Sequence, residues 1–356
     1  MSRSKAYKAL FVVLLGITVG CGDPDGGAPE AEVAARVAGV VGGWAATHAQ
    51  IFSTVEIRRA GAPSGFCSGT LISPTLVVTA AHCAVVEPEE GSLEPAAPGG
   101  LWVAAGHLAS KAATDGMMRS VAEARVHREY DHDFIMGRSR QGAGQGGIGS
   151  PNDIALLFLD RPFRHITPAA LLTAERDAAL VRHGDVAFVA GYGVHDLEDR
   201  ASGELYISDA IIDIIGEREI LTRRGDGLGD SCYGDSGGPL YVPTAEGDFL
   251  VGLVSRGRSD VERDCGDGGV YTRLSAHLPW IAEAGGAAFE PRWDASEEPL
   301  SFTEDGADPI TAPRGGALQG GGACSATPVG PSGASPLLAG MLLLGLMFLS
   351  RRLSGC

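Results

Sequence analysis

Three short stretches of the sequence carry side chains that together could perform nucleophilic catalysis. His82 lies near the end of the apolar run Leu76–Cys83, and Asp153 opens a second apolar run. Ser236 lies within the glycine-rich stretch Gly229–Leu240. A serine hydroxyl is a poor nucleophile at neutral pH unless a neighbouring base accepts its proton. A lone Gly-Asp-Ser-Gly sequence is more often an ordinary turn, so the prediction of a reactive serine depends on the other two stretches.

The order of these three residues and their surrounding sequences resemble those of the trypsin/chymotrypsin family of serine proteases, over residues 40–285. The resemblance implies that His82 takes the proton from Ser236 and later returns it to the leaving amine, while Asp153 orients the imidazole. It also implies that the backbone N–H groups of Gly234 and Ser236 bind the oxyanion that develops on the substrate. The implied reaction is hydrolysis of a peptide bond through an acyl-enzyme.

Short β-branched and apolar runs, bounded by turn residues, recur through the middle of the chain and predict an all-β sandwich or barrel. The resemblance makes this more specific, because it implies two packed six-stranded antiparallel Greek-key barrels. An apolar pattern over Leu274–Ala284 predicts a helix that closes the domain. The predicted strands span Phe52–Ile57, Gly69–Ile72, Leu76–Thr79, Leu101–Ala104, Ile154–Leu159, Val186–Val189, Phe249–Val254 and Gly269–Leu274.

The cysteines divide between the middle of the chain and its ends. Seven are present, with three in the terminal segments and four in the middle. An even set in an exported domain predicts two disulfides. The resemblance implies which cysteines pair, and the implied pairs are Cys67–Cys83 and Cys232–Cys265. Each bond would clamp one of the catalytic segments.

Substrate preference is implied by the residue six positions before Ser236, which is Asp230. A carboxylate at the bottom of a slot selects a cationic side chain. Gly257 and Gly269 match the family positions at which glycine keeps this slot open. The resemblance therefore implies cleavage after Arg or Lys. The alternative interpretation of Asp230 is a solvated turn aspartate, since aspartate is common in loops.

Three departures from the family pattern concern the cleft. The wall segment Arg258–Asp264 is longer than in trypsin and Gly266–Gly268 is shorter, so we expect the pocket wall to be re-routed. Arg256 replaces a tryptophan, and a cation there is expected to repel basic residues upstream of the scissile bond. A glycine-rich insertion, Gln141–Ser150, precedes Asp153 and is expected to form a surface loop near the cleft.

Activation by cleavage is a further implication of the resemblance. Val40 and the three residues after it, Val-Gly-Gly, resemble the family's new N-terminus, whose freed amine would bury against Asp235. Because an unpaired buried carboxylate is costly, the uncut chain is expected to have a poorly formed site. Gly39 precedes Val40, so the expected cut requires another protease or a trimming step. A mature N-terminus at Val37, directly after Arg36, would contradict this prediction.

The first 39 residues predict export and a removable leader. Residues 1–21 carry basic residues, then a short apolar run and small residues, as in a secretory signal peptide. Two types of signal remain open, an ordinary one and a lipoprotein type in which Cys21 is lipidated. Residues 22–39 show no strand alternation and predict a mobile activation leader.

The C-terminal residues predict a stalk followed by a sorting or anchor segment. Residues 286–323 are acidic and then glycine-rich, as in a flexible stalk. Within residues 324–356, Cys324, the apolar run 337–349 and two following arginines resemble a myxobacterial C-terminal sorting signal. This second resemblance implies display at the outer membrane of a bacterium, with membrane contact through the segment. The run is shorter than the roughly 20 residues that span a bilayer, and a hydrophobic tail on a soluble protein is the alternative.

Composition and charge narrow the expected partners. A formal net charge of −16 argues against nucleic acid, which requires a basic protein surface. No metal or cofactor is expected, because the histidines other than His82 lack metal-ligand spacing. The expected partners are protein or peptide substrates and an activating protease. Two other functions stay open: the same fold with a non-tryptic pocket, and a catalytically silent binding module.

Overall fold

The computed structural model describes residues 44–45, 53–86, 92–112, 116–139, 141–224, 229–261 and 265–295. All of these residues belong to the first of two units into which the chain divides, Met1–Pro313 and Arg314–Cys356. The predicted signal peptide, activation leader and sorting segment, with Val40, Cys21 and Cys324, lie outside the described residues. Within the described part of the chain, no helix is both long and apolar enough to cross a membrane.

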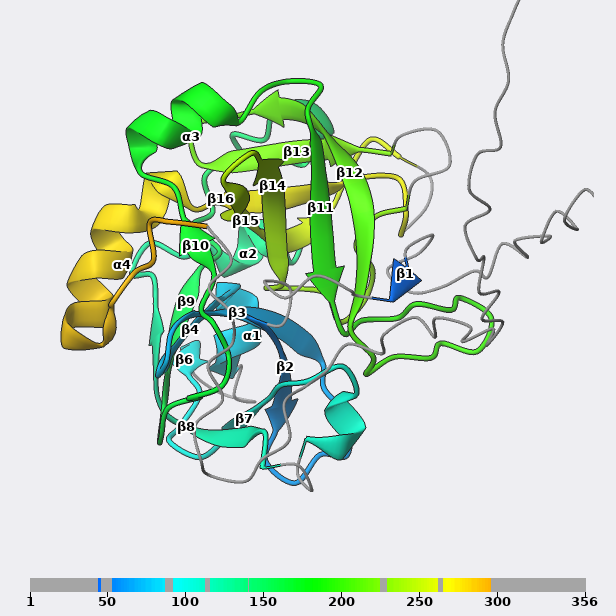
Figure 1. The fold of residues 1–356 in the computed structure, drawn as a ribbon. Coiled ribbons are helices and arrows are strands. Elements are labelled where there is room, and N and C mark those ends of the chain that lie inside the picture. Colours follow the sequence, from blue (N-terminus) through cyan, green and yellow to red (C-terminus); the bar gives the residue numbers. More distant parts are fainter. Residues whose placement is uncertain are drawn as a thin grey trace, which may run out of the picture. The chain divides into compact units, whose positions relative to one another are not determined.

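A closed six-stranded antiparallel barrel forms the N-terminal part of the described chain (Figure 1). Counted along the chain, its strands lie in the order first, second, third, sixth, fifth, fourth, and the fourth pairs with the first. This order is a Greek key, because the fourth strand returns beside the first. The strands are β2 (Thr54–Arg59), β3 (Cys67–Ser73), β4 (Leu76–Thr79), β7 (Leu101–Ala104), β8 (Met118–Val126) and β9 (Ala155–Leu159).

A second barrel follows with the same strand order, closed by the pairings of β11 with β14 and of β12 with β13. Its strands are β11 (Val186–Gly191), β12 (Tyr206–Ile215), β13 (Glu219–Arg223), β14 (Pro239–Thr244), β15 (Gly247–Gly257) and β16 (Gly269–Arg273). Four short strands add to the barrels or pair with each other: β1 (Trp44–Ala45), β5 (Val85–Val86), β6 (Glu94–Pro95) and β10 (Ala170–Leu171).

The predicted fold of two six-stranded antiparallel barrels with a C-terminal helix is confirmed. Four barrel strands, β8, β12, β13 and β14, were not predicted by the pattern of apolar runs. The β8 sequence contains Ala-Glu-Ala-Arg, which favours a helix locally, and Val121 is its one fully buried residue. Pairing with β7 and β9 outweighs that preference. β14 begins at Pro239, a residue tolerated at the first position of a strand.

Apolar packing fills each barrel and also joins them. A third buried cluster combines Ile72 and Leu156 of the first barrel with Tyr241 and Leu253 of the second. Full burial of one such side chain contributes about 1.5–3 kcal/mol to stability. This shared cluster fixes the barrels against each other, so loops from both can form one site.

Helices are few in the described residues. The predicted helix over Leu274–Ala284 begins as a 3₁₀ turn, Ser275–His277, and becomes α-helical in α4 (Leu278–Gly285), which buries Ile281 in the shared cluster. The other α-helices are α1 (Ala81–Ala84), α2 (His132–Ile135) and α3 (Ala174–Leu180), and further 3₁₀ turns span Ala109–Lys111, Gln145–Gly147 and Gly286–Ala288.

Packing against the second barrel continues past Gly285, where the sequence predicts the domain to end. The Leu171 N–H from β10 donates to the Arg292 carbonyl at 2.8 Å. Ala295 is completely buried in the core of the second barrel. The first residues of the predicted stalk are therefore part of the packed structure, while residues 296–323 lie outside the described part.

Candidate active site

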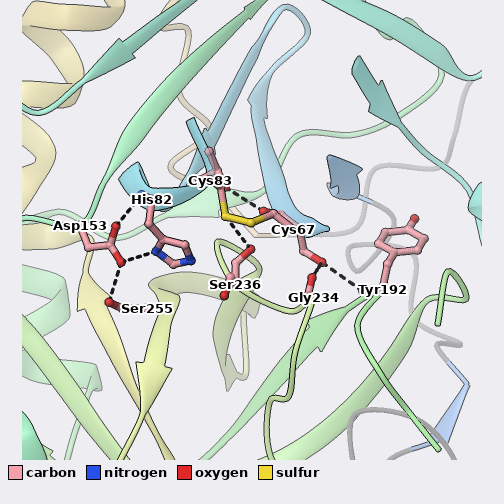
Figure 2. Close-up of a disulfide and its surroundings, with 10 residues drawn as sticks. Cys67, His82, Cys83, Asp153, Tyr192, Gly234, Ser236 and Ser255 are labelled. Atoms are coloured by element: carbon pink, nitrogen blue, oxygen red, sulfur yellow. Dashed lines mark hydrogen bonds and ion pairs between the residues drawn. A yellow bond between two sulfur atoms is a disulfide. The ribbon is translucent and has the colours of Figure 1, made fainter. Parts of the chain in front are cut away.

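The three predicted catalytic side chains come from both barrels. His82 lies in α1 directly after β4, Asp153 precedes β9, and Ser236 lies in the loop that leads into β14. The Ser68 N–H on β3 donates to the Ser236 carbonyl at 2.8 Å, which holds the serine loop of the second barrel against the first. Figure 2 shows the His82 ring between the Asp153 carboxylate and Ser236.

The Asp153 carboxylate is held by three donors. His82 Nδ1 lies 2.9 Å from Asp153 Oδ2, and the His82 backbone N–H donates to Oδ1 at 3.0 Å. The Ser255 hydroxyl donates to Oδ2 at 2.7 Å (Figure 2). Because a carboxylate only accepts hydrogen bonds, Nδ1 carries the proton of the neutral ring and Nε2 is the nitrogen free to accept one.

Burial and pairing act in opposite directions on the His82–Asp153 pair. Burial disfavours the charged imidazole, but the charge and hydrogen bond of Asp153 outweigh it and raise the pKa of His82. Burial also disfavours the Asp153 carboxylate, yet the charge of His82 and the hydrogen bonds from His82 and Ser255 lower the pKa of Asp153. The site therefore favours a charged imidazole beside a charged carboxylate, which is the state formed when His82 accepts a proton.

Glycine is required on both sides of Ser236 by close packing. Gly234 has φ +96°, and a Cβ there would lie 2.9 Å from the Cα of Gly193. Gly237 has φ +79°, and a Cβ there would lie 2.0 Å from Thr79 Oγ1. Side chains rarely adopt such φ values and would not fit in the space. The loop that carries Ser236 therefore has this shape only with glycine at both positions.

Hydrogen bonds from neighbours fix the peptide planes around Ser236. The Val194 N–H donates to the Tyr233 carbonyl, which precedes Gly234, at 2.7 Å. The Gly238 N–H donates to the Asp235 carbonyl, which precedes Ser236, at 2.8 Å. A trans peptide directs its N–H opposite to its C=O. The N–H of Gly234 therefore points away from Val194, and the N–H of Ser236 points away from Gly238. These are the two N–H groups that the resemblance assigns to the oxyanion.

The structure contains the disulfides Cys67–Cys83 and Cys232–Cys265. The first joins β3 to α1 beside His82, and Cys83 Sγ lies 3.4 Å from the Ser236 carbonyl oxygen, a contact without a hydrogen because the sulfur is in a disulfide. The second joins the serine loop to the segment that leads into β16. The bonds close loops of 16 and 33 residues, which corresponds to about 3–4 kcal/mol of stabilisation each.

Asp235, next to Ser236, is completely buried. The backbone N–H groups of Gly193 and Cys232 donate to its carboxylate at 2.9 and 2.8 Å. Gly191 also borders it, since a Cβ there would lie 2.0 Å from Asp235 Oδ1. Burial raises the pKa of Asp235 to about 7 against the effect of these two hydrogen bonds. No cation pairs with Asp235 within the described residues, and Val40 lies outside them.

Asp230 is also completely buried, rather than a solvated turn residue. Its carboxylate accepts hydrogen bonds from the Tyr271 hydroxyl, from Thr222 Oγ1 at 3.1 Å and from the Ser231 N–H at 2.6 Å. Burial raises its pKa, and the hydrogen bonds oppose that rise. Gly269 borders the carboxylate, because a Cβ there would lie 3.5 Å from Asp230 Oδ2.

Gly257 and Gly269 face each other as partners in the pairing of β15 with β16. The wall segment that follows Gly257 is fixed at its start by Arg258. The guanidinium of Arg258 donates to the Thr222 carbonyl and to Asp213 Oδ2, both at 2.9 Å. The start of the wall segment is thus attached to β13 at Thr222, the residue whose hydroxyl binds Asp230.

The expectation that Arg256 repels basic substrate residues is wrong in one respect, because its charge is not free. Arg256 donates to both carboxylate oxygens of Glu219, at 2.6 and 2.9 Å. Their side chains are only 9% and 2% exposed. Sequence reasoning missed Glu219 because it opens β13, a strand that the apolar pattern did not reveal. Pairing with the Glu219 carboxylate reduces the repulsion that Arg256 exerts on a basic substrate residue, because the two opposite charges largely offset each other at a distance.

The insertion Gln141–Ser150 is not simply a surface loop. Gly146 and Gly147 are buried, and a Cβ at Gly146 would lie 2.5 Å from a side-chain carbon of Leu221 on β13. The Ser259 N–H donates to the Gly146 carbonyl at 3.1 Å. The insertion therefore packs on the second barrel, and its glycines permit the close approach.

One group of potential metal ligands occurs in the described residues, formed by Cys67, His82 and Cys83 within 4.8 Å of one another. The two sulfur atoms are bonded to each other and have no thiolate to offer a metal. The group therefore does not qualify as a metal site.

Residues 40–281 match the sequence profile described as Trypsin, and the chain belongs to this family of serine proteases. Coagulation factor IX of Cavia porcellus is 28% identical, in an alignment that covers 68% of this chain and 80% of that protein. Glucanase inhibitor protein 1 of Phytophthora sojae is 30% identical, in an alignment that covers 71% of this chain and 90% of that protein. Phenoloxidase-activating factor 3 of Holotrichia diomphalia is 27% identical over 64% of this chain and 66% of its own length.

Two further polar residues that touch the site were missed from the sequence. Ser255 binds Asp153, and Ser68 donates to the Gly234 carbonyl at 2.9 Å while accepting from the Tyr192 N–H at 3.1 Å. Hydroxyl residues are ordinary in strands, so neither position stands out in the sequence. Only the proximity of Ser255 to Gly257 offered a signal for its role.

Proposed function

We propose that this chain is an exported serine endopeptidase that cleaves peptide bonds with Ser236, His82 and Asp153. The observation that carries the proposal is the His82 imidazole, which is oriented by Asp153 through Nδ1 and lies between that carboxylate and Ser236 (Figure 2). Family membership supports the same reaction. Asp153 and its donor Ser255 are buried, so the ring orientation is set by the folded core.

In the proposed reaction, Ser236 Oγ attacks the substrate carbonyl while its proton passes to His82 Nε2. The negative charge on the carbonyl oxygen is received by the N–H groups of Gly234 and Ser236, whose orientations are consistent with this role. His82 then gives its proton to the leaving amine, and the acyl-enzyme forms. Water, deprotonated by His82, attacks the acyl group and returns Ser236 to its starting state.

For the side chain before the scissile bond, we propose Arg or Lys, selected by Asp230 between Gly257 and Gly269. A carboxylate offers about four acceptor positions, and donors from Tyr271, Thr222 and both the backbone and the side chain of Ser231 reach Asp230. In this proposal a substrate cation replaces one of these neutral donors, because a charge-assisted hydrogen bond is stronger than a neutral one. The alternative is a pocket that does not select Arg or Lys. It is supported by Arg258, a cation whose guanidinium donates to the carbonyl of Thr222, the residue whose hydroxyl donates to Asp230.

We further propose that the chain is a zymogen cut before Val40 by another protease. A freed Val40 amine would supply a cation to Asp235, which is buried and has a raised pKa. The same proposal assigns residues 1–21 to a signal peptide, 22–39 to a leader and 40–285 to the protease domain. Residues 286–323 would form a stalk and 324–356 a sorting segment at the outer surface. Two disulfides suit an exported protein.

A second candidate function is a binding module without catalysis. It is favoured by one observation, namely that a relative of 30% identity is named a glucanase inhibitor protein. Under this candidate, the barrels would present a surface to a protein partner, and Ser236 would form no acyl group.

The test uses the full chain with a protease site introduced directly before Val40, so that cleavage leaves Val40 as the N-terminus. Turnover of Arg, Lys, Phe and Ala amide substrates is measured, with Ser236→Ala as the control. We expect Ser236-dependent turnover after Arg and Lys. Turnover only after Phe or Ala would refute the role of Asp230, and no turnover of any substrate would favour the binding module. N-terminal sequencing of the natural exported protein tests the cut before Val40 separately.

A further inference from the structure

Arg256 follows Ser255 directly on β15, and its guanidinium reaches three parts of the molecule. It binds both carboxylate oxygens of Glu219 on β13, as described above. Its Nη2 donates to the Gly147 carbonyl in the insertion at 2.6 Å. Its Nη1 donates to the hydroxyl oxygen of Ser255 at 3.2 Å, and that hydroxyl donates to Asp153. One side chain thus connects the second barrel, the insertion and the triad carboxylate.

The insertion is attached to this ion pair at further points. The Gly149 N–H donates to Glu219 Oε2 at 2.6 Å. The guanidinium of Arg256 lies 5.1 Å from the centre of the Phe134 ring, and a Cβ at Gly149 would lie 2.6 Å from the same ring. Because the insertion leads into Asp153, these contacts fix the segment from which the triad carboxylate projects.

We propose that Arg256 is a positioning residue of the active site, which orients Ser255 toward Asp153 and fastens the insertion Gln141–Ser150 to Glu219. The inference rests on the proposed function and adds a residue to it. A buried ion pair gains little stability over apolar packing, because burial of both charges is costly. Stability alone therefore does not account for a buried Arg256–Glu219 pair at this position. Its hydrogen bonds to the insertion and to Ser255 do account for it.

The charge of Arg256 acts on His82 as well. Two charged side chains shift the pKa of His82 in opposite directions. Asp153 raises this pKa, and Arg256 lowers it by a smaller amount. Loss of Arg256 leaves Glu219 as an unpaired negative charge, so the pKa of His82 should rise. Loss of the Glu219 charge leaves Arg256 unpaired, so the pKa of His82 should fall.

The test compares Arg256→Gln, Glu219→Gln, the double variant and Arg256→Lys in the full chain cut before Val40. Arg273→Gln is the matched control, because Arg273 forms a similarly buried ion pair with Asp177 and donates to the Gly216 carbonyl, neither of which is a site residue. The measurements are kcat, KM, the pH profile of kcat/KM, the melting temperature, and the pKa of His82 from an NMR titration of its ring.

We expect Arg256→Gln to lower kcat about tenfold, the loss that corresponds to one hydrogen bond of the triad. The acid limb of its kcat/KM profile should move to higher pH, and that of Glu219→Gln to lower pH. The double variant should return the limb toward the wild-type position while kcat stays low. Arg256→Lys should keep the limb in place with a reduced kcat. Arg273→Gln should lower the melting temperature and leave kcat and the limb unchanged.

The inference is overturned if Arg256→Gln matches Arg273→Gln in kcat and in the pH profile, or if Arg256→Gln and Glu219→Gln move the limb in the same direction. Failure of the proposed function looks different, since the wild-type chain would then show no Ser236-dependent turnover. In that case the NMR titration still decides: opposite shifts of the His82 pKa in the two variants support the inference, and equal or absent shifts overturn it.

Discussion

Two buried aspartates lie at the centre of the site, and they differ in whether a cation accompanies them. Asp153 and Asp235 are both completely buried. Asp153 is paired with His82, and its pKa is lowered. Asp235 accepts two backbone N–H groups, and burial raises its pKa to about 7. Burial opposes the charged form of both side chains, so the opposite directions come from the histidine partner of Asp153.

Within the described residues, Asp153 has a cationic partner and Asp235 has none. His82 and Asp153 both project from the first barrel, and Ser255 of the second barrel donates a further hydrogen bond to the Asp153 carboxylate. The Asp235 carboxylate is in close contact with Gly191 and Gly193, and no cation pairs with it among the described residues. In our proposal the Val40 amine fills that role. Asp230 extends the series, as a third buried aspartate whose cation would arrive with the substrate.

The largest effect on activity is expected when the ion pair between His82 and Asp153 is removed. Asp153→Asn should lower kcat by about four orders of magnitude, because the amide can favour the wrong tautomer of His82. The measurement is kcat on an Arg amide substrate, with Asp133→Asn as an exposed control. A decrease of less than tenfold would show that the ion pair does not set the state of His82.

Candidate site residues could be proposed from the sequence where they lie in distinctive motifs. His82, Asp153 and Ser236 were predicted from three ordered stretches, and the structure places them in one site. Both barrels also followed from the resemblance, although the apolar pattern alone missed β8, β12, β13 and β14. Those strands mix polar with apolar residues, and their pairing is a property of the whole barrel.

Residues that act through long-range contacts could not be predicted. Glu219 and Arg256 are far apart in the sequence, and each alone is an ordinary charged residue. Their pairing depends on the alignment of β13 with β15 through β16. The expectation for Arg256 was wrong because sequence indicates the sign of a charge, but not the partner that neutralises it.

The second effect is a pH dependence of stability in the uncut chain, caused by the buried Asp235 carboxyl. The unfolded carboxyl has a pKa near 3.8 and the folded one about 7, so the folded state binds more protons between these values. Stability should therefore fall as pH rises from 4 to 7, by up to about 4 kcal/mol. Asp235→Asn cannot ionise and should remove this loss. The measurement is the free energy of unfolding in urea at several pH values.

Cleavage before Val40 provides the contrast for this prediction. If the new amine pairs with Asp235, the carboxylate is stabilised and the cut chain should lose little stability between pH 4 and 7. In the cut chain Asp235→Asn should then be destabilising at pH 7, the reverse of its effect in the uncut chain. The same pH dependence before and after cleavage would contradict the pairing of Val40 with Asp235.

A third effect tests whether Asp230 is a site for a substrate cation. Asp230→Asn keeps the shape and removes the charge, so kcat/KM for Arg and Lys substrates should fall roughly 10²- to 10³-fold, as expected when one partner of a buried ion pair is lost. Turnover after Ala should change little. If Arg and Ala substrates are affected equally, the carboxylate supports the loop rather than the substrate.

The smallest effect distinguishes the two kinds of donor at Asp153. Ser255→Ala removes one hydrogen bond and leaves the His82 pair intact, so kcat should fall about tenfold. The acid limb of kcat/KM should stay in place, because no charge near His82 changes. Ser53→Ala is the matched control, since Ser53 is a buried hydroxyl bonded to Tyr241. It should cost similar stability without lowering kcat, and an equal loss of kcat in both variants would reduce the role of Ser255 to stability alone.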